Sequence, residues 1–228
     1  MKKLSALLLL TTALLIPRGQ AANFNVAAGD TAGLITAITT ANANSMANTI
    51  DLAPGAYTFS AADNFEFGPN ALPQITSDLT LNGHGATLAR GAGAPKFRFF
   101  YVAGNSVGNL PAGHLTLTDL TLQGGLAKGG DSDRGGGGAG MGGAIFNHGQ
   151  VTLTRVTLTA NTAQGGRSGV VGLALGGGGI GGDAFFGSGG GFGGAFKGQG
   201  GSGGSGGGHH GGGGGAFVRE TMARTAPK

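Results

Sequence analysis

Two segments in the middle of the chain alternate apolar residues with threonine in the same order. The segment 115–122 has the sequence Leu-Thr-Leu-Thr-Asp-Leu-Thr-Leu, and the segment 151–158, 36 residues later, has the sequence Val-Thr-Leu-Thr-Arg-Val-Thr-Leu. Part of the same pattern, Leu-Thr-Leu at 79–81, lies a further 36 residues upstream. Because successive side chains of a strand point to opposite faces, the pattern predicts strands that bury leucine and valine and present threonine on the other face.

A single extra residue interrupts the alternation in each full copy, Asp119 in the first and Arg155 in the second. We interpret it as a bend, after which the apolar face points inward again. Each copy then supplies two short strands to one coil of a solenoid. An antiparallel sandwich also contains short alternating strands, and chance repetition in a chain rich in threonine and leucine is a further alternative. The fixed interval favours the solenoid.

A helix is predicted ahead of the first strands, in the N-terminal region 22–48. Asp30 can accept hydrogen bonds from the free amides at its start, and Leu34, Ile35 and Ile38 recur at helical spacing. An amphipathic helix in this place is suited to cover the open end of a stack of strands, whose apolar face otherwise meets water. Further short strands are predicted at 49–52, 56–59, 78–81, 86–88 and 97–102.

Glycine supplies 53 of the 228 residues, and 41 of these glycines lie between positions 124 and 215. Large apolar side chains are concentrated before about residue 158, so we expect the packed core in the first two thirds of the chain. The segment 165–215 is predicted to be a low-complexity segment without a core, because glycine loses the most entropy on ordering and has no side chain to bury. Alternatively, the Gly-Ala-Phe triplets at 194–196 and 215–217 begin further coils.

The first residues show the three regions of a secretory signal peptide: Lys2 and Lys3, an apolar run over 4–16, and small residues up to Ala22. A membrane anchor needs ~20 apolar residues. We therefore predict export through the inner membrane, an extracellular, outer-membrane-associated or periplasmic location, and no transmembrane helix in the mature chain. Beyond the signal, 11 basic residues accompany 10 acidic ones, which leaves no basic stripe for nucleic acid. The chain has no cysteine, which excludes disulfides and thiolate metal sites.

The segment 142–149, Gly-Gly-Ala-Ile-Phe-Asn-His-Gly, is followed by the alternating segment 151–158 and by Asn-Thr-Ala at 161–163. This succession resembles the repeat of bacterial surface proteins such as polymorphic outer-membrane proteins and autotransporter passengers. The resemblance covers about residues 30–166. It implies an all-β fold, a right-handed parallel β-helix (a pectate-lyase-like solenoid) with a short N-terminal capping helix and a glycine-rich C-terminal tail. Because members of that family continue through more coils, it also implies that this chain is truncated.

Asn147 and Asn161 match the turn positions of the bacterial surface-protein repeat that this chain resembles. The match implies structural turn roles, because asparagine tolerates a left-handed backbone and bonds to neighbouring backbone groups. The predicted organisation is a signal peptide at 1–21, an N-terminal cap with a helix at 22–48, parallel β-helix coils at 49–164, a glycine-rich segment at 165–215 and a non-repeat tail at 216–228.

Candidate chemistry is sparse. Hydrolysis of a polysaccharide needs two carboxylates at a defined separation, but Asp119 occupies the position at which the next copy has Arg155, which favours solvated surface. Gly-His-Gly around His84 is similar to a polygalacturonase motif whose other elements are missing, so we predict a turn there. Asp131 and Asp133, in a glycine-rich loop, are the candidate metal ligands, for calcium, although two acids form an incomplete oxygen cage.

We therefore expect no catalytic residues and no cofactor beyond the candidate calcium ion. The predicted function is that of an exported bacterial cell-surface or secreted protein, structural or adhesin-like, whose coils and loops bind polysaccharides or cell-surface glycans. The alternative is a polysaccharide lyase or glycoside hydrolase of β-helix fold, with its site in missing coils or near residues 131–134. A non-functional fragment is a third alternative. The motifs are informative for fold and weak for activity, because one scaffold hosts many functions.

Overall fold

The computed structural model describes residues 20–44, 46–104, 111–131, 137–167, 189–193 and 197–200. The predicted signal peptide, apart from its last two residues, and the predicted tail at 216–228 lie outside the described residues. Within the described part of the chain, no helix is long and apolar enough to cross a bilayer.

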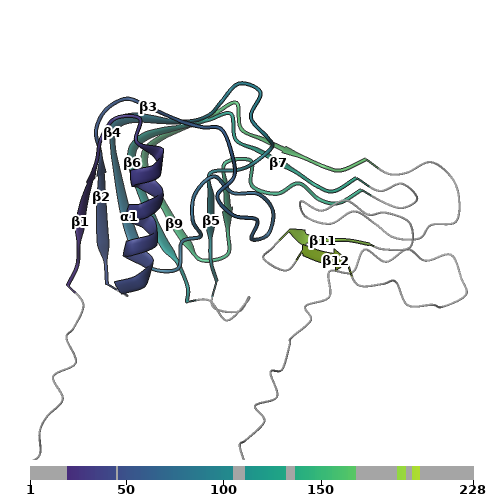
Figure 1. Cartoon of the computed structure of the whole chain (residues 1–228), viewed down its shortest axis with the longest axis horizontal. Helices are drawn as coiled ribbons and strands as arrows, with labels where there is room; N and C mark the ends of the chain where they lie inside the picture. The colour runs from purple at the N-terminus through teal and green to yellow at the C-terminus, as the bar shows by residue number, and fades with distance from the viewer. Residues whose placement is uncertain are drawn as a thin grey trace, which may run out of the picture.

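Six strands form one sheet in which every pairing is parallel (Figure 1). Five of them lie side by side in the order β1-β2-β4-β6-β9, and β3 pairs with β4. Their bounds are β1 (Asn23–Val26), β2 (Asn48–Leu52), β3 (Ala56–Phe59), β4 (Asp78–Arg90), β6 (His114–Gln123) and β9 (Gln150–Thr159). The order in the sheet therefore follows the order in the chain.

The repeated segments pair with each other in register. Leu81 lies beside Leu117, and Leu117 lies beside Leu153. The same holds beyond the bend, where Leu122 lies between Leu88 and Leu158. The side chains of Leu81 and Leu117 are fully buried, so the interval of 36 residues is the length of chain that returns each leucine to the same column of the core.

The interrupting residues do form a bend. Asp119 and Arg155 have φ angles of 50° and 52°, and His84, near the corresponding point of β4, has φ 48°. The left-handed region is uncommon for residues other than glycine, and here it absorbs the one extra residue, so that the inward alternation resumes on the other side. Leu120 is accordingly only 2% exposed.

Glycines precede both repeated strands at equivalent positions. A Cβ atom on Gly113 would lie 2.1 Å from the carbonyl oxygen of Ile75, and one on Gly149 would lie 2.2 Å from the carbonyl oxygen of Gly113. The amide of Gln150 donates to the same Gly113 carbonyl at 2.9 Å. Only glycine allows successive turns of the backbone to approach this closely.

The predicted helix is α1 (Thr31–Asn44), which packs against β1, β2 and β3. Asp30 caps it, because its Oδ1 accepts a hydrogen bond from the amide of Gly33 at 2.8 Å. Leu34 and Ile38 are fully buried and belong to the same core as the leucines of the sheet. Figure 1 shows the helix lying against the N-terminal strands of the sheet, where its buried side chains share one core with those of the strands.

The other strands are short and form separate two-stranded sheets. β5 pairs with β8 and β7 pairs with β10, both in parallel, whereas β11 and β12 are antiparallel. Their bounds are β5 (Phe100–Val102), β7 (Leu126–Lys128), β8 (Ile145–Asn147), β10 (Thr162–Gln164), β11 (Gly189–Gly193) and β12 (Lys197–Gly200).

The prediction of an all-β right-handed parallel β-helix is therefore wrong. The described residues form a parallel sheet with one helix, and no closed solenoid is found among them. The two short strands expected on either side of each bend are a single continuous strand of 10 to 13 residues. The other parallel pairs, β5 with β8 and β7 with β10, extend over only three residues each, too few to build further sheets of equal size. Among its described residues, the segment 165–215, predicted to be a low-complexity segment without a core, contains the antiparallel pair β11 and β12.

The register of the leucines predicts the effect of core substitution. Replacing Leu117 by alanine should lower the free energy of unfolding by about 2–5 kcal/mol, because it removes a fully buried side chain held between two others. Thr118→Ala, at the next residue and on the outward face, is the control and should cost less than about 1 kcal/mol. Urea unfolding of both variants measures the difference; equal losses would contradict the inward column.

Candidate binding face

The outward side of the sheet carries aligned threonines, which we call the threonine face. Thr49, Thr80, Thr116 and Thr152 form one column across four strands, since each pairs with the next in register. Shorter columns complete the face, and their members are Thr118 and Thr154 before the bend and Thr87, Thr121 and Thr157 after it. Within the described part of the chain, none of these hydroxyl groups is bonded to another protein group, so they are available to a ligand.

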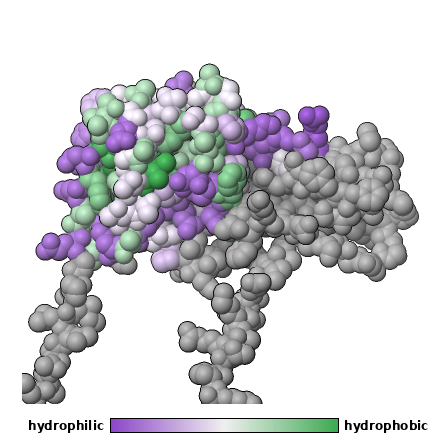
Figure 2. Space-filling model, viewed as in Figure 1, coloured by the Kyte–Doolittle hydropathy of each residue, from purple (hydrophilic) through white to green (hydrophobic). Residues whose placement is uncertain are grey.

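Polar and apolar residues are interspersed on the molecular surface seen in Figure 2. Most of the described aromatic side chains, by contrast, are buried, although Phe65 is 59% exposed. Phe67, Tyr101 and Phe146 pack against one another, with ring centroids of Phe67 and Tyr101 4.9 Å apart, and the guanidinium of the buried Arg98 lies 4.8 Å from the ring centroid of Phe146. The rings therefore serve the core and not the threonine face.

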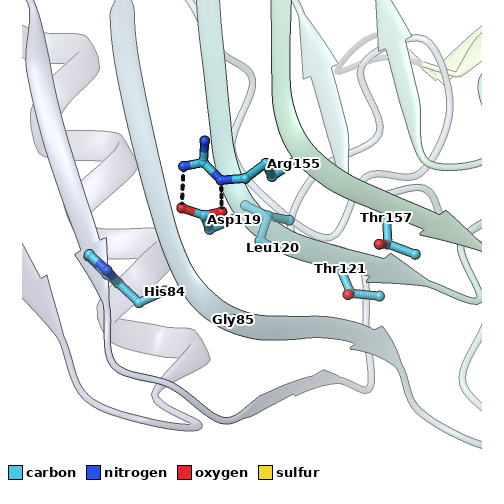
Figure 3. A pocket seen from close by; sticks show the side chains of 7 residues that line it. All are labelled: His84, Gly85, Asp119, Leu120, Thr121, Arg155 and Thr157. Atoms are coloured by element: carbon cyan, nitrogen blue, oxygen red, sulfur yellow. Dashed lines mark hydrogen bonds and ion pairs between the residues drawn. The ribbon is translucent and has the colours of Figure 1, made fainter.

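A shallow hollow lies on the outward side at the bend, and we call it the bend groove. Asp119 and Arg155 lie at its centre because they occupy the same position on the neighbouring strands β6 and β9 (Figure 3). Nη2 of Arg155 donates to Oδ2 of Asp119 at 2.6 Å, and Nε donates to Oδ1, which makes the pair bidentate. The lining residues of the groove are His84, Gly85, Asp119, Leu120, Thr121, Arg155 and Thr157.

A second polar cluster adjoins the bend groove on the β4 side. Nε2 of His84 lies 3.1 Å from Oδ1 of Asp51, and Nδ2 of Asn82 donates to the same oxygen at 3.0 Å. The hydrogen bond from Asn82, followed by that with His84, holds the pKa of Asp51 below its ordinary value. The hydrogen bonds from Arg155 likewise lower the pKa of Asp119.

These pKa shifts decide what the two carboxylates can do. Hydrolysis of a glycosidic bond needs one carboxylic acid that keeps its proton, which requires a raised pKa. Asp51 and Asp119 are both shifted the other way and are ionised at neutral pH, and each already accepts hydrogen bonds from neighbouring side chains. The bend groove therefore offers hydrogen bonds and compensated charges, not an acid–base pair.

The candidate calcium ligands are only partly described. The carboxylate of Asp131 pairs with Nζ of Lys128 and accepts a hydrogen bond from the amide of Arg167 at 2.7 Å. The pairing with Lys128, followed by the Arg167 amide, lowers the pKa of Asp131. Asp133 lies outside the described residues, and within those residues no group of three or more histidine, aspartate or glutamate side chains is close enough to hold a metal ion. Calcium binding stays a prediction.

The two predicted turn asparagines make different contacts. Asn161 bridges to the preceding repeat: its Nδ2 donates to the carbonyl of Leu122 and its Oδ1 accepts from the amide of Gly125, both at 2.8 Å. Asn147 acts locally, since its Oδ1 accepts a hydrogen bond from the amide of Gly149 at 2.9 Å. In the described chain the positive φ near Asn161 belongs to Ala160.

Sequence reasoning missed the pairing of Asp119 with Arg155. It interpreted the acid Asp119, at the position where the next copy has the base Arg155, as solvated surface without a specific partner. In a parallel in-register sheet, however, equivalent positions are neighbours, so opposite charges at an interval of 36 residues attract each other. The same interval that revealed the leucine columns was the signal for this pair.

Searches of family models, curated proteins and solved structures found no match to this chain.

Replacing Arg155 by glutamine should raise the pKa of Asp119 toward its ordinary value of 3.8, because the hydrogen bonds from the guanidinium are lost. Asp51, which is held by Asn82 and His84, should keep its pKa and serves as the internal control. Carboxyl chemical shifts followed by NMR against pH measure both.

The same pair sets a pH dependence of stability. The folded pKa of Asp119 lies below the unfolded value, so its contribution is complete above the unfolded pKa and is lost as pH falls through the folded pKa. In Arg155→Gln, the part of the loss of stability at acid pH that comes from Asp119 should disappear. An unchanged Asp119 titration in the variant would show that the pair does not form.

Proposed function

We propose that this protein is an exported bacterial cell-surface or secreted protein, structural or adhesin-like, whose threonine face binds an extended, hydroxyl-rich glycan. The resemblance of residues 30–166 to repeat proteins of bacterial surfaces and the signal-peptide pattern of the first residues support the setting. The alignment of threonines across four parallel strands is the observation that carries the binding proposal.

The spacing of the threonines favours a polymer over a single sugar. Neighbouring strands lie about 4.8 Å apart, so the hydroxyls form a repeating array. One hydrogen bond contributes only about 0.5–1.5 kcal/mol net. Useful affinity therefore needs several of these contacts at once, and a ligand with repeating hydroxyl groups can supply them.

The sheet beneath the threonine face reduces the cost of binding. The backbones of β4 and β6 are hydrogen-bonded on both sides, and the leucines under them are buried. The threonines of these strands are therefore held in place before a ligand arrives, and threonine has few rotamers to lose.

The charges of the bend groove favour a neutral glycan. Asp119 and Arg155 already satisfy each other, as Figure 3 shows. An acidic polymer that recruited Arg155 would have to displace Asp119 and leave its carboxylate beside the incoming anion. A neutral polymer can instead bond to the threonines and to the free lone pairs of the groove without breaking the pair.

The test is a pull-down of the full chain with insoluble neutral polysaccharides, cellulose and chitin, and with the acidic polymers pectate and alginate. Replacing Thr116, Thr118, Thr152 and Thr154 by valine keeps the β-branched shape and removes the hydroxyls, and should weaken binding to the neutral polymer at least about tenfold. Serine at the same four positions keeps the hydroxyls and should retain binding.

A control variant, Thr36→Val/Thr39→Val, removes exposed helix threonines whose hydroxyls bond to backbone carbonyls, and should bind like the wild type. If the four-valine variant binds the neutral polymer as strongly as the wild type does, the proposal is contradicted. Release of reducing or unsaturated ends from any of the four polymers would show an enzyme instead.

A further inference from the structure

The last strand of the sheet, β9, exposes side chains that its neighbours bury. Leu153 is 44% exposed and Leu158 is 50% exposed, whereas Leu117 and Leu122, at the same positions on β6, are fully buried. We call the outer backbone of β9, together with Val151, Leu153, Val156 and Leu158, the β9 edge. Proteins normally cover or charge such an edge, because its free amide and carbonyl groups and apolar side chains attract another strand.

Within the described residues, the chain does not cover this edge. The strand order of the sheet ends at β9. One interval of 36 residues after β9, the segment 187–194 has the sequence Gly-Ser-Gly-Gly-Gly-Phe-Gly-Gly, which contains no leucine, valine or threonine. The strand found there, β11, pairs with β12 and not with β9.

The order of apolar and polar side chains in β9 is the same when the strand is read from either end. Around the point between Thr154 and Arg155, Val151 corresponds to Leu158 and Leu153 corresponds to Val156, and all four belong to the inward pattern. Thr152 corresponds to Thr157 on the outward face in the same way. A strand with this symmetry matches a second copy of itself placed antiparallel, with apolar residues opposite apolar residues and threonine opposite threonine.

We propose that two copies of this chain join through their β9 edges around a two-fold axis that passes between Thr154 and Arg155. Such an isologous contact closes after two copies and removes both open edges. Charge does not oppose it, because each Arg155 is already paired with Asp119 of its own chain. The joined sheet would also extend the threonine face across both copies, although the dimer itself does not depend on glycan binding.

The absence of native cysteine makes a disulfide test specific. In the variant Thr152→Cys/Thr157→Cys, position 152 of one copy should lie opposite position 157 of the other, at a Cα separation of about 4.5–5.5 Å, which suits a disulfide. Mild oxidation of the full chain should give a covalent dimer on a non-reducing gel. The singly substituted variants should form it efficiently only when mixed with each other.

The matched control is Thr80→Cys/Thr87→Cys, which places cysteines in the same two columns but on the inner strand β4. It should stay monomeric on the gel. Light scattering of the wild type should give twice the mass of one chain, and Leu153→Lys should raise the dimer dissociation constant at least about tenfold without loss of the fold, because this side chain is exposed in the single chain. A monomeric wild type, or cross-linking no greater than in the control, would overturn the proposal.

Discussion

Each inward leucine of this sheet lies beside a leucine, valine or isoleucine at the same register on a neighbouring strand, and this stacking fixes the rest of the fold. Because side chains alternate with period two, a slip of one residue would turn the whole inward set to solvent. Burying a leucine or valine side chain contributes about 1.5–3 kcal/mol, so the register is strongly fixed wherever several columns run in parallel. Ile50, Leu81 and Leu117 form one such column, fully buried.

The outward face is a consequence of the inward one. Once leucines at alternate positions are fixed inside, the threonines between them must align outside, and the odd residue of each repeat must align at the bend. The threonine columns and the pairing of Asp119 with Arg155 are thus two results of a single register. A face that repeats at the strand spacing is suited to a ligand that also repeats, and this connects the packing of the core to the proposed glycan binding.

The local pattern was enough to predict the repeated strands at 115–122 and 151–158, the helix after Asp30 and the bend at Asp119 and Arg155. These predictions succeeded because alternation and helical spacing depend on neighbouring residues alone. The fold class was not predictable in the same way. Whether short strands close into further faces depends on distant segments, and the glycine-rich stretches between the repeats carry no side-chain pattern that reveals their partners.

The site illustrates the same limit. Asp51, Asn82 and His84 meet because β2 and β4 are neighbours, a fact of tertiary pairing. Asp119 and Arg155 were visible in the sequence as equivalent positions, but their attraction becomes apparent only once the repeats are known to lie side by side in parallel. The exposure of Leu153 and Leu158 likewise depends on whether another strand lies beside β9, whereas their sequence is typical of a buried strand.

The in-register stacking can be observed directly in solution. Selective methyl labelling of leucine and valine, with nuclear Overhauser measurements between methyl groups, reports which side chains touch. The register requires contacts from Leu117 to both Leu81 and Leu153, and from Leu122 to both Leu88 and Leu158. Contacts displaced by two residues along β6, or Hα–Hα contacts typical of antiparallel pairing between β4 and β6 or between β6 and β9 of the same chain, would contradict the stacked columns.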